Sequence, residues 1–380
     1  MMIYLDHNAT TPVHPDVVEA LLPFLQGKFG NPSSIHWAGR AVKGAVEEAR
    51  EQVAALAGCE PAEVVFTSTG TEADNMAIKG AASALGGGGN HIVTTQVEHP
   101  AVANCCLYLE SLGFEVTRVP VDRDGLLDLE RLEAAVTDRT ILISAMAANN
   151  ETGVLFPVRE IGEIAARRRV PFHCDGVQAA GKVPLSVRDD GISFLSLSGH
   201  KLYAPKGIGA LVVRRGVKCQ PLIHGGSQER NRRGGTENVA GIVAFGRACA
   251  IAKETMNDEM GRLKGLRDRL EAGILARISG ARVNGHRELR LPTTANITIP
   301  GVEADSLLMA LDLEGIAASS GSACSSGTLK LSPVLAAMGR TPGEARGSVR
   351  FSLGRGNTDQ EIDRVLAVLP AIVARLRGES

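Results

Sequence analysis

The sequence predicts an α/β protein built on a mainly parallel sheet, with a smaller α+β region toward its C-terminal end. Between about residues 60 and 215, short apolar runs alternate with longer segments of helical period, the pattern of strand–helix repeats. Most of these runs are rich in β-branched residues and apolar throughout, as expected of strands covered on both faces. After about residue 258 the alternation stops, which indicates a second unit of different architecture.

Seven apolar runs are the candidate strands of the main sheet. Helical segments lie between them, for example residues 158–165, in which apolar side chains recur with helical spacing. Another amphipathic helix precedes the first strand, because Val42, Val46 and Val53 fall on one helical face. The candidate strands are residues 63–67, 92–97, 115–121, 140–146, 170–175, 192–198 and 208–214.

The C-terminal third is expected to hold fewer and more varied elements. Serine is a favourable N-cap and proline is favourable in a first helical turn, so a Ser-Pro pair predicts a helix start. The expected elements are a helix over 260–278, a strand over 295–299, a short helix over 305–313, a helix that Ser332 and Pro333 open, and a final helix over 362–373. We therefore divide the chain into a large domain, residues 13–258, and a small domain, residues 1–12 and 259–380.

Composition and charge exclude several classes of protein. The 380 residues carry 41 basic and 42 acidic side chains, without the basic excess of a nucleic-acid-binding protein. Since no apolar run is long enough to span a bilayer and the first residues lack the layout of a signal peptide, we expect no membrane partner. Seven cysteines, an odd number, do not suggest a disulfide framework, so we expect a reducing, cytoplasmic compartment.

One candidate phosphate site follows the first strand of the predicted sheet. Residues 64–75 form a strand, a loop of Ser, Thr and Gly, and a helical segment. Thr69 with Glu72 three residues later has the spacing of a capping box. The free N–H groups and dipole of such a helix start attract anions, although an ordinary capped helix has the same sequence pattern.

A second segment is a near match to a nucleotide-binding motif. Residues 176–183 nearly spell the P-loop, with Gly181 and Lys182 in the expected places. Val183, however, stands where a hydroxyl must reach Mg²⁺, and Asp175 would place a carboxylate near the phosphates. An NTPase is therefore disfavoured, and it would require ATP turnover that depends on Lys182.

A lysine and an aspartate are expected at the carboxyl ends of two buried strands. Lys201 follows the run 192–198, and Asp175 ends the run 170–175. Ligands of open α/β sheets bind at this edge, and desolvation there favours a lysine that forms Schiff bases. A carboxylate on the ring nitrogen of a pyridoxal cofactor would keep that nitrogen protonated. The lysine, the aspartate and the phosphate loop together are far more specific than each alone.

A histidine and a cysteine complete the candidate residues. His99 follows the strand 92–97, where its ring could stack on a cofactor or serve as a structural hydrogen-bonding group. Cys324 lies among small polar residues in 319–328, and an exposed thiol in such a segment favours a nucleophile. No set of Cys and His has the spacing of a zinc site, so we expect no resident metal.

Several of these motifs together resemble the cysteine desulfurases of the NifS/IscS group, class V of the fold-type I pyridoxal-phosphate enzymes. The resemblance runs from Tyr4-Leu5-Asp6-His7-Asn8 to the Arg-Phe-Ser-Leu-Gly-Arg segment at 350–355. Its most specific markers are Ser-Gly-His-Lys at 198–201 and Ser-Gly-Ser-Ala-Cys at 320–324. The implied architecture is a large domain with a mainly parallel seven-stranded sheet, and a small domain that carries the catalytic cysteine loop.

The resemblance also implies roles for single residues in a homodimer that binds pyridoxal 5'-phosphate. Lys201 would form the Schiff base, Cys324 would be the nucleophile and His99 would stack on the ring and supply a proton. Arg350 and Asn150 would bind the substrate, L-cysteine. The residues implied to hold the cofactor are Gly70, Thr71, His99, Asn150, Asp175, Gln178, Ser198, His200, Lys201 and, reaching the phosphate of the partner subunit, Thr236.

The implied reaction converts L-cysteine to L-alanine and leaves the sulfur as a persulfide on Cys324. The acceptor would be an iron–sulfur scaffold or a tRNA-thiolation protein, and Cys324 could transiently ligate a nascent cluster. Two departures from the family bear on delivery: Lys330-Leu331 replaces the usual acidic residue and proline, and the longer scaffold-docking tail of housekeeping members is absent. Rival functions are another class V enzyme (an aminotransferase or selenocysteine lyase) and a non-catalytic sulfur carrier with the same fold.

Overall fold

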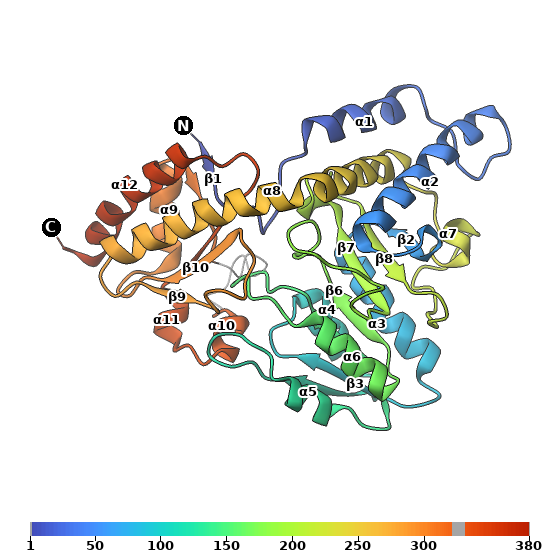
Figure 1. The fold of residues 1–380 in the computed structure, drawn as a ribbon, viewed down its shortest axis with the longest axis horizontal. Helices are drawn as coiled ribbons and strands as arrows, with labels where there is room; N and C mark the ends of the chain where they lie inside the picture. Colours follow the sequence, from blue (N-terminus) through green and yellow to red (C-terminus); the bar gives the residue numbers. More distant parts are fainter. Residues whose placement is uncertain (1, 321–330, 380) are drawn as a thin grey trace.

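The computed structural model describes residues 2–320 and 331–379, and these form two lobes that one long helix connects (Figure 1). The larger lobe contains a seven-stranded sheet in the order β2-β8-β7-β6-β5-β3-β4. All neighbouring strands in it run parallel except β8, which is antiparallel to both β2 and β7. The strands are β2 (Val64–Thr67), β3 (His91–Thr95), β4 (Glu115–Val119), β5 (Thr140–Met146), β6 (Phe172–Asp175), β7 (Phe194–Ser198) and β8 (Gly209–Val213).

All seven predicted strands are confirmed, and only their ends differ. The run 140–146 matches β5 residue for residue, whereas the predicted strands at 170–175 and 192–198 begin two residues too early. The difference at β7 has a local cause, since Ser193 donates its N–H to Phe172 and Gly191 adopts a left-handed φ of 67°. The mainly parallel seven-stranded sheet expected from the sequence is therefore present.

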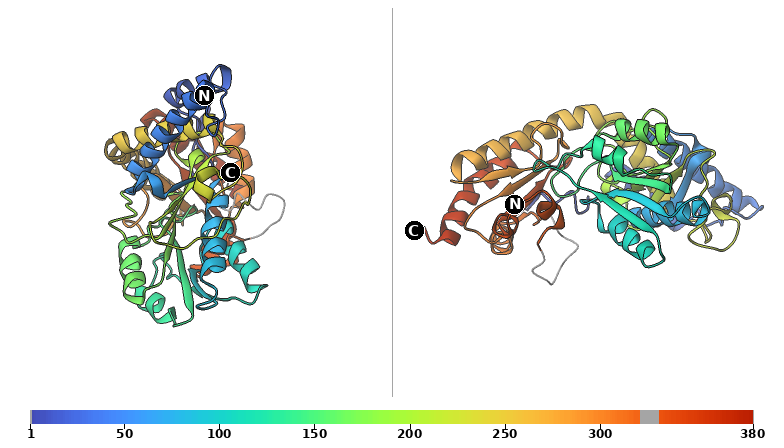
Figure 2. Two further views of the ribbon diagram at one scale, coloured as in Figure 1. Left: turned by 90° about the vertical axis from the view of Figure 1, so that its right-hand side faces the viewer. Right: turned by 90° about the horizontal axis from the view of Figure 1, so that it is seen from below.

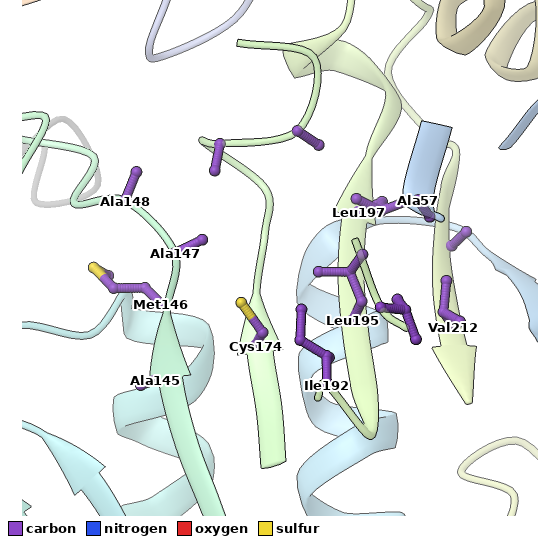
Figure 3. Packing of buried hydrophobic residues seen from close by; sticks show 14 of the residues in the cluster. Ala57, Ala145, Met146, Ala147, Ala148, Cys174, Ile192, Leu195, Leu197 and Val212 are labelled. Carbon is purple, nitrogen blue, oxygen red and sulfur yellow. The ribbon is translucent and has the colours of Figure 1, made fainter. Parts of the chain in front are cut away.

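Helices cover both faces of this sheet. On one face α3 and α4 pack against a cluster that includes Ile92, Leu142 and Phe194. On the other face, Cys174, Leu195 and Val212 of three neighbouring strands point into the main core (Figure 3). The large-lobe helices are α1 (Pro15–Gln26), α2 (Trp37–Ala57), α3 (Gly70–Leu85), α4 (Pro100–Glu110), α5 (Leu129–Ala135), α6 (Val158–Arg168) and α7 (Gln228–Asn231).

The smaller lobe is an α+β unit, as predicted. Its antiparallel sheet has the order β12-β10-β9, and the N-terminal β1 (Ile3–Tyr4) pairs in parallel with β11 (Ile316–Ala317). The remaining elements are β9 (Arg282–Asn284), β10 (Thr294–Thr298), β12 (Ser348–Ser352), α9 (Ala304–Leu313), α10 (Pro333–Ala337), α11 (Pro342–Arg346) and α12 (Asp359–Arg377).

The helix α8 (Val239–Arg277) belongs to both lobes (Figure 2). Its first part, including Phe245 and Ala252, packs in the core of the large lobe. Its second part, including Leu263 and Ile274, packs in a separate core together with Ile3 and Leu5. We retain the division between residues 258 and 259 as a proposal, and it would fall inside this continuous helix. Nowhere in the described residues is a helix both long and apolar enough to traverse a lipid bilayer.

Candidate active site

The main sheet gathers the candidate residues at one edge. Because β2 runs in the same direction as β7, and β7 is parallel to β6, β5, β3 and β4, six strands of this sheet have their carboxyl ends on the same side. Open α/β sheets bind ligands at this edge. The residues at or just after these ends are Gly70 after β2, His99 after β3, Asn150 after β5, Asp175 at the end of β6, and Ser198 with Lys201 at the end of β7.

Lys201 is half-buried and lies in the short 3-10 helix Gly199–Lys201 that follows β7. Its amine donates to the main-chain carbonyl of Ala9 at 2.8 Å and also to that of Asn8. The amine is therefore held against the N-terminal segment, at the sheet edge.

Gln178 connects the same N-terminal segment to a buried lysine. The Gln178 Nε2 donates to the Asn8 carbonyl at 2.9 Å, and the Gln178 Oε1 accepts from Lys182 Nζ at 3.1 Å. Lys182 is only 8% exposed, and residues 176–182 make a series of turns rather than a P-loop and helix. The lysine of the near match to a nucleotide-binding motif therefore bonds the Gln178 side chain and does not lie in a phosphate loop.

Asp175 is a buried carboxylate beside His99. One of its oxygens accepts the N–H of Val177 at 3.0 Å. Burial, and next the negative charge of Asp74, raise the pKa of Asp175, whereas His99 lowers it. Such a carboxylate gains most from a cation or a charged N–H donor that is placed against it.

His99 has the structural hydrogen-bonding role that its sequence position left open. Its Nδ1 accepts the N–H of Ala101 at 3.2 Å, so the ring caps α4. A neutral imidazole with Nδ1 as acceptor carries its proton on Nε2. Burial lowers the pKa of His99, which favours this neutral form, and Asp175 and Lys201 act on it in opposite senses.

Gly70, the first residue of α3, is packed too closely against its neighbours for a side chain to fit. A Cβ at Gly70 would lie 2.9 Å from Val177 Cγ2 and 3.1 Å from the Cβ of Ser198. The backbone of the α3 N-terminus therefore closely approaches the ends of β6 and β7. Thr71 beside it is exposed, and Ser198 is buried.

The capping box expected at this helix is only half present. Thr69 Oγ1 accepts the N–H of Glu72 at 3.0 Å, as predicted. The Glu72 carboxylate, however, accepts the N–H of Ser68 at 2.7 Å rather than that of Thr69. It also binds Arg233 Nε at 2.9 Å, and this second partner holds Glu72 outside the reciprocal capping geometry.

Arg350 lies at the lobe boundary, where it is buried apart from 2% of its surface. Its Nη2 lies 2.6 Å from Asp6 Oδ1, and its Nη1 donates to the Asn150 carbonyl at 2.9 Å. The same carbonyl accepts from Asn8 Nδ2 at 3.2 Å. Arg350 and Asn150 thus belong to the network that also holds Lys201 and Gln178.

The remaining predicted residues differ in how closely they join this group. His200 shares a hydrogen bond of 3.2 Å with Thr10, next to the carbonyls that hold Lys201. Thr236 is exposed and, among the described residues, no hydrogen bond connects it to the other site residues. Cys324 lies outside the described residues. The described residues on either side of it are tied to the site: Ser319 bonds the backbone of Arg350, and Ser332 Oγ donates to Glu151 Oε2 at 2.5 Å.

Asn8 is the residue that the sequence analysis did not single out. Its backbone and side chain contact Lys201, Gln178 and Asn150, as well as Thr294 and Ser352 of the small lobe. Its sequence signal was its place in the segment 4–8, with which the family resemblance begins, but no role was assigned to it there. Its partners are distant in sequence, so no local pattern could reveal them.

Comparison with known proteins gives consistent results over nearly the whole chain. The model of the family Aminotransferase class-V matches residues 3–365. A "Cysteine desulfurase" of Nostoc sp. is 52% identical over 379 residues, covering 100% of this chain and 94% of that protein. A "Cysteine desulfurase IscS" of Dictyoglomus turgidum is 50% identical, covering 99% of this chain and 95% of that protein.

Solved structures agree with the sequence relatives. A "NIFS-like protein" has a TM-score of 0.93 and 38% identity, covering 99% of this chain and 100% of its own. A structure described as "SspA in complex with cysteine" has a TM-score of 0.81 and 36% identity, covering 92% of this chain and 98% of its own.

Proposed function

This chain belongs to the class-V aminotransferase family, and from that premise we propose the roles of its residues in desulfurating L-cysteine. It is a pyridoxal-phosphate-dependent cysteine desulfurase with the fold of type I enzymes. One observation supports these roles most strongly. The Lys201 amine, the Asp175 carboxylate and the closely packed Gly70 at the start of α3 lie at the same edge of the sheet.

The residues at this edge fit pyridoxal 5'-phosphate. Asp175, a buried carboxylate with a raised pKa, suits the ring nitrogen, and the N-terminus of α3, which begins at Gly70, offers backbone N–H groups to a phosphate. Lys201 would hold the cofactor through its amine, and His99 would lie against the ring. Gln178 would donate to the phenolic oxygen. The phosphate ligands would be Gly70, Thr71, Ser198 and His200, with Thr236 reaching the phosphate of the second subunit and Asn150 contacting the ring or substrate.

Bound at this edge, the cofactor supplies an electron sink for negative charge at the α-carbon of the substrate. The protein supplies binding and proton transfer. Arg350 would bind the substrate carboxylate with its planar fork of donors, and Asn150 would help to orient the substrate. Lys201 Nζ would take the α-proton, and the Nε2–H of His99 would donate a proton to the departing product.

Cys324 would be the nucleophile for sulfur. Its thiolate would attack the sulfur of L-cysteine, so that an S–S bond forms and the bond between Cβ and sulfur breaks. The electron pair of the broken bond stays with carbon, which is protonated, and L-alanine leaves. One sulfur atom remains on Cys324 as a persulfide.

The described residues beside Cys324 support this role. Ser319 bonds Arg350, and Cys324 is five residues further along the chain. Five residues span at most about 18 Å when fully extended. The thiol therefore starts from an attachment point at the substrate-binding arginine, which makes contact with a bound substrate feasible.

Mass spectrometry after incubation of the holoenzyme with L-cysteine tests this function. We expect one added sulfur, about 32 Da by chemical composition, on the peptide that contains Cys324 and none on the peptide that contains the buried Cys249. Cys324→Ala should remove persulfide and alanine formation while the visible absorption of the cofactor stays. Lys201→Ala should remove persulfide and alanine formation and also the visible absorption of the cofactor. Unchanged alanine formation in Cys324→Ala would contradict the mechanism and favour a lyase or aminotransferase.

Three further proposals concern the setting of the enzyme. We propose a homodimer, because Thr236 is exposed and makes no hydrogen bond to the other site residues within the described part of its own chain. We propose that an acceptor protein of iron–sulfur assembly or tRNA thiolation takes the sulfur from Cys324. A cytoplasmic location is supported by the six cysteines in the described residues, which are all free thiols.

A further inference from the structure

Lys182 is a buried amine with an uncharged hydrogen-bond partner. Its side chain is 8% exposed, and its Nζ donates to the side-chain oxygen of Gln178 at 3.1 Å. No carboxylate of the described residues lies within ion-pair distance of this amine. Buried lysines are normally paired with acids. Because the Lys182 amine donates to an amide oxygen instead, the bond must have a role other than the neutralisation of charge.

The two partners of Gln178 allow one orientation of its amide. The carbonyl of Asn8 can only accept a hydrogen bond, so it requires the NH₂ end of Gln178. The Lys182 ammonium can only donate, so it requires the oxygen end. The two bonds hold the amide from both ends, and without Lys182 only the bond to the Asn8 carbonyl would hold it.

The NH₂ end of Gln178 lies on the side of the reacting lysine. Both Gln178 Nε2 and Lys201 Nζ donate to the same carbonyl oxygen of Asn8. One N–H of Gln178 is used in this bond, and the amide has a second N–H on the same nitrogen. A phenolate oxygen next to Lys201 needs a donor, which only this orientation provides.

We infer that Lys182 is a positioning residue that fixes the Gln178 side chain with its N–H donors toward the phenolic oxygen of the cofactor. The inference deepens the proposed function and depends on the role given there to Gln178. Lys182 does not touch substrate and acts through Gln178. Burial, with further effects of Lys201 and Arg350, lowers the pKa of Lys182 to about 7. Because the NH₂ end of Gln178 is bonded to the Asn8 carbonyl, the amide presents its oxygen to the Lys182 amine in either protonation state.

The test is the pH titration of the visible absorption of the purified holoenzyme. The proton-poor form of the bound cofactor carries one more negative charge, and a donor at its phenolic oxygen stabilises that form. Lys182→Met removes the donor to Gln178 and leaves a side chain of similar length. We expect the midpoint of the titration to rise by about one pH unit, with the folded structure retained.

A double-mutant cycle separates orientation from charge. Gln178→Ala should raise the midpoint. Lys182→Met should add nothing further in the Gln178→Ala background, because both changes act on the same donor to the phenolic oxygen. A midpoint that Lys182→Met leaves unchanged, or shifts that add in the double variant, would overturn the inference. If Lys182→Met does not fold, Lys182→Leu, which also lacks a donor, replaces it in the cycle.

The proposed function and this inference fail in different ways. A wild-type protein that shows no visible cofactor absorption, or absorption that persists in Lys201→Ala, contradicts the proposed function. A titration midpoint that is the same in Lys182→Met as in the wild type contradicts only the role of Lys182. Thermal unfolding of each variant is the control, since a merely structural role would lower stability without moving the midpoint.

Discussion

Arg50 of α2 and Glu229 of α7 form a two-bond ion pair that is almost fully buried. Both bonds measure 2.8 Å, and the side chains are 5% and 3% exposed. Glu229 also accepts the N–H of Phe66 in β2 at 2.9 Å. Because Glu229 and Arg230 have left-handed φ values of 45° and 57°, the pair holds a strained turn against the main sheet.

Removing the charge of Glu229 should therefore destabilise the protein strongly. Glu229→Gln leaves the buried Arg50 with only its half-exposed carboxylate partner Glu47, and breaking a buried pair costs up to about 3–5 kcal/mol. The measurement is the free energy of unfolding in urea. The matched control is Glu115→Gln, which breaks the exposed two-bond pair with Arg139 and should change nothing measurable. Equal effects of the two variants would contradict the importance of burial here.

Arg350→Lys should weaken substrate binding more than turnover. A lysine can provide charge but not the two parallel donors of a guanidinium, and the substrate carboxylate would lose one of its bonds. We expect KM for L-cysteine to rise roughly 10- to 100-fold. Steady-state kinetics of the holoenzyme give this value. Arg269→Lys, at an exposed pair on α8, serves as the control. A fall in kcat at constant KM would show that Arg350 has another role.

Two substitutions separate the capping and catalytic roles of His99. Asn is a good N-cap, so His99→Asn should keep the bond to Ala101 while it removes the ring. We expect His99→Asn to unfold near the wild-type temperature and His99→Ala to lose about 1 kcal/mol. Both should lose most of the desulfurase activity. Activity that survives in His99→Asn would reduce the histidine to its structural role.

Glu98 should make stability decline as pH rises. Burial raises the pKa of Glu98 to about 8, well above its value of about 4.3 in an unfolded chain. Between these values the folded state holds a proton that the unfolded state has released. The group therefore lowers stability by up to about 1.4 kcal/mol for each pH unit as pH rises from 4.3 toward 8.

Glu98→Gln should flatten this pH dependence. The Glu98 Oε1 accepts from Thr95 and Met146, whereas Oε2 has no hydrogen-bond partner, so an amide can replace the protonated acid. Thermal unfolding of cofactor-free protein from pH 5 to 9 measures the change. Glu51→Gln, at an exposed position of α2, is the control and should keep the wild-type slope. A variant whose slope equals that of wild type would contradict the buried, protonated state.

The sequence predicted the fold well because its strands carry their own signal. Val64–Thr67 and Thr140–Met146 are rich enough in apolar and β-branched residues to be recognised alone, and the alternation of strands with helices along the chain implies a parallel sheet. Lys201 and Asp175 were found for the same reason, since each directly follows or ends such a strand. The ends of strands were less certain, because turns such as the one at Gly191 depend on tertiary contacts.

Other features depend on residues that are far apart in sequence. Asn8 meets Gln178 across 170 positions, and Lys182 matched a motif whose geometry the chain does not adopt. Glu72 fits a capping box until Arg233, 161 residues away, provides a stronger partner. Spacing along the chain cannot report such contacts, which explains why the capping box is only half present, whereas the P-loop match was already disfavoured by Val183 and Asp175.

The pairing of the N-terminal residues with the C-terminal part of the chain has a consequence for biosynthesis. Ile3 pairs with Ile316, and the Asn8 N–H binds Ser352 Oγ at 2.9 Å. Thr11 bonds His200 beside Lys201, so this segment can dock on the large lobe early. Its contacts with the small lobe form only after the ribosome has made more than 350 residues, so the setting of the Lys201 amine is complete only when nearly the whole chain has been made.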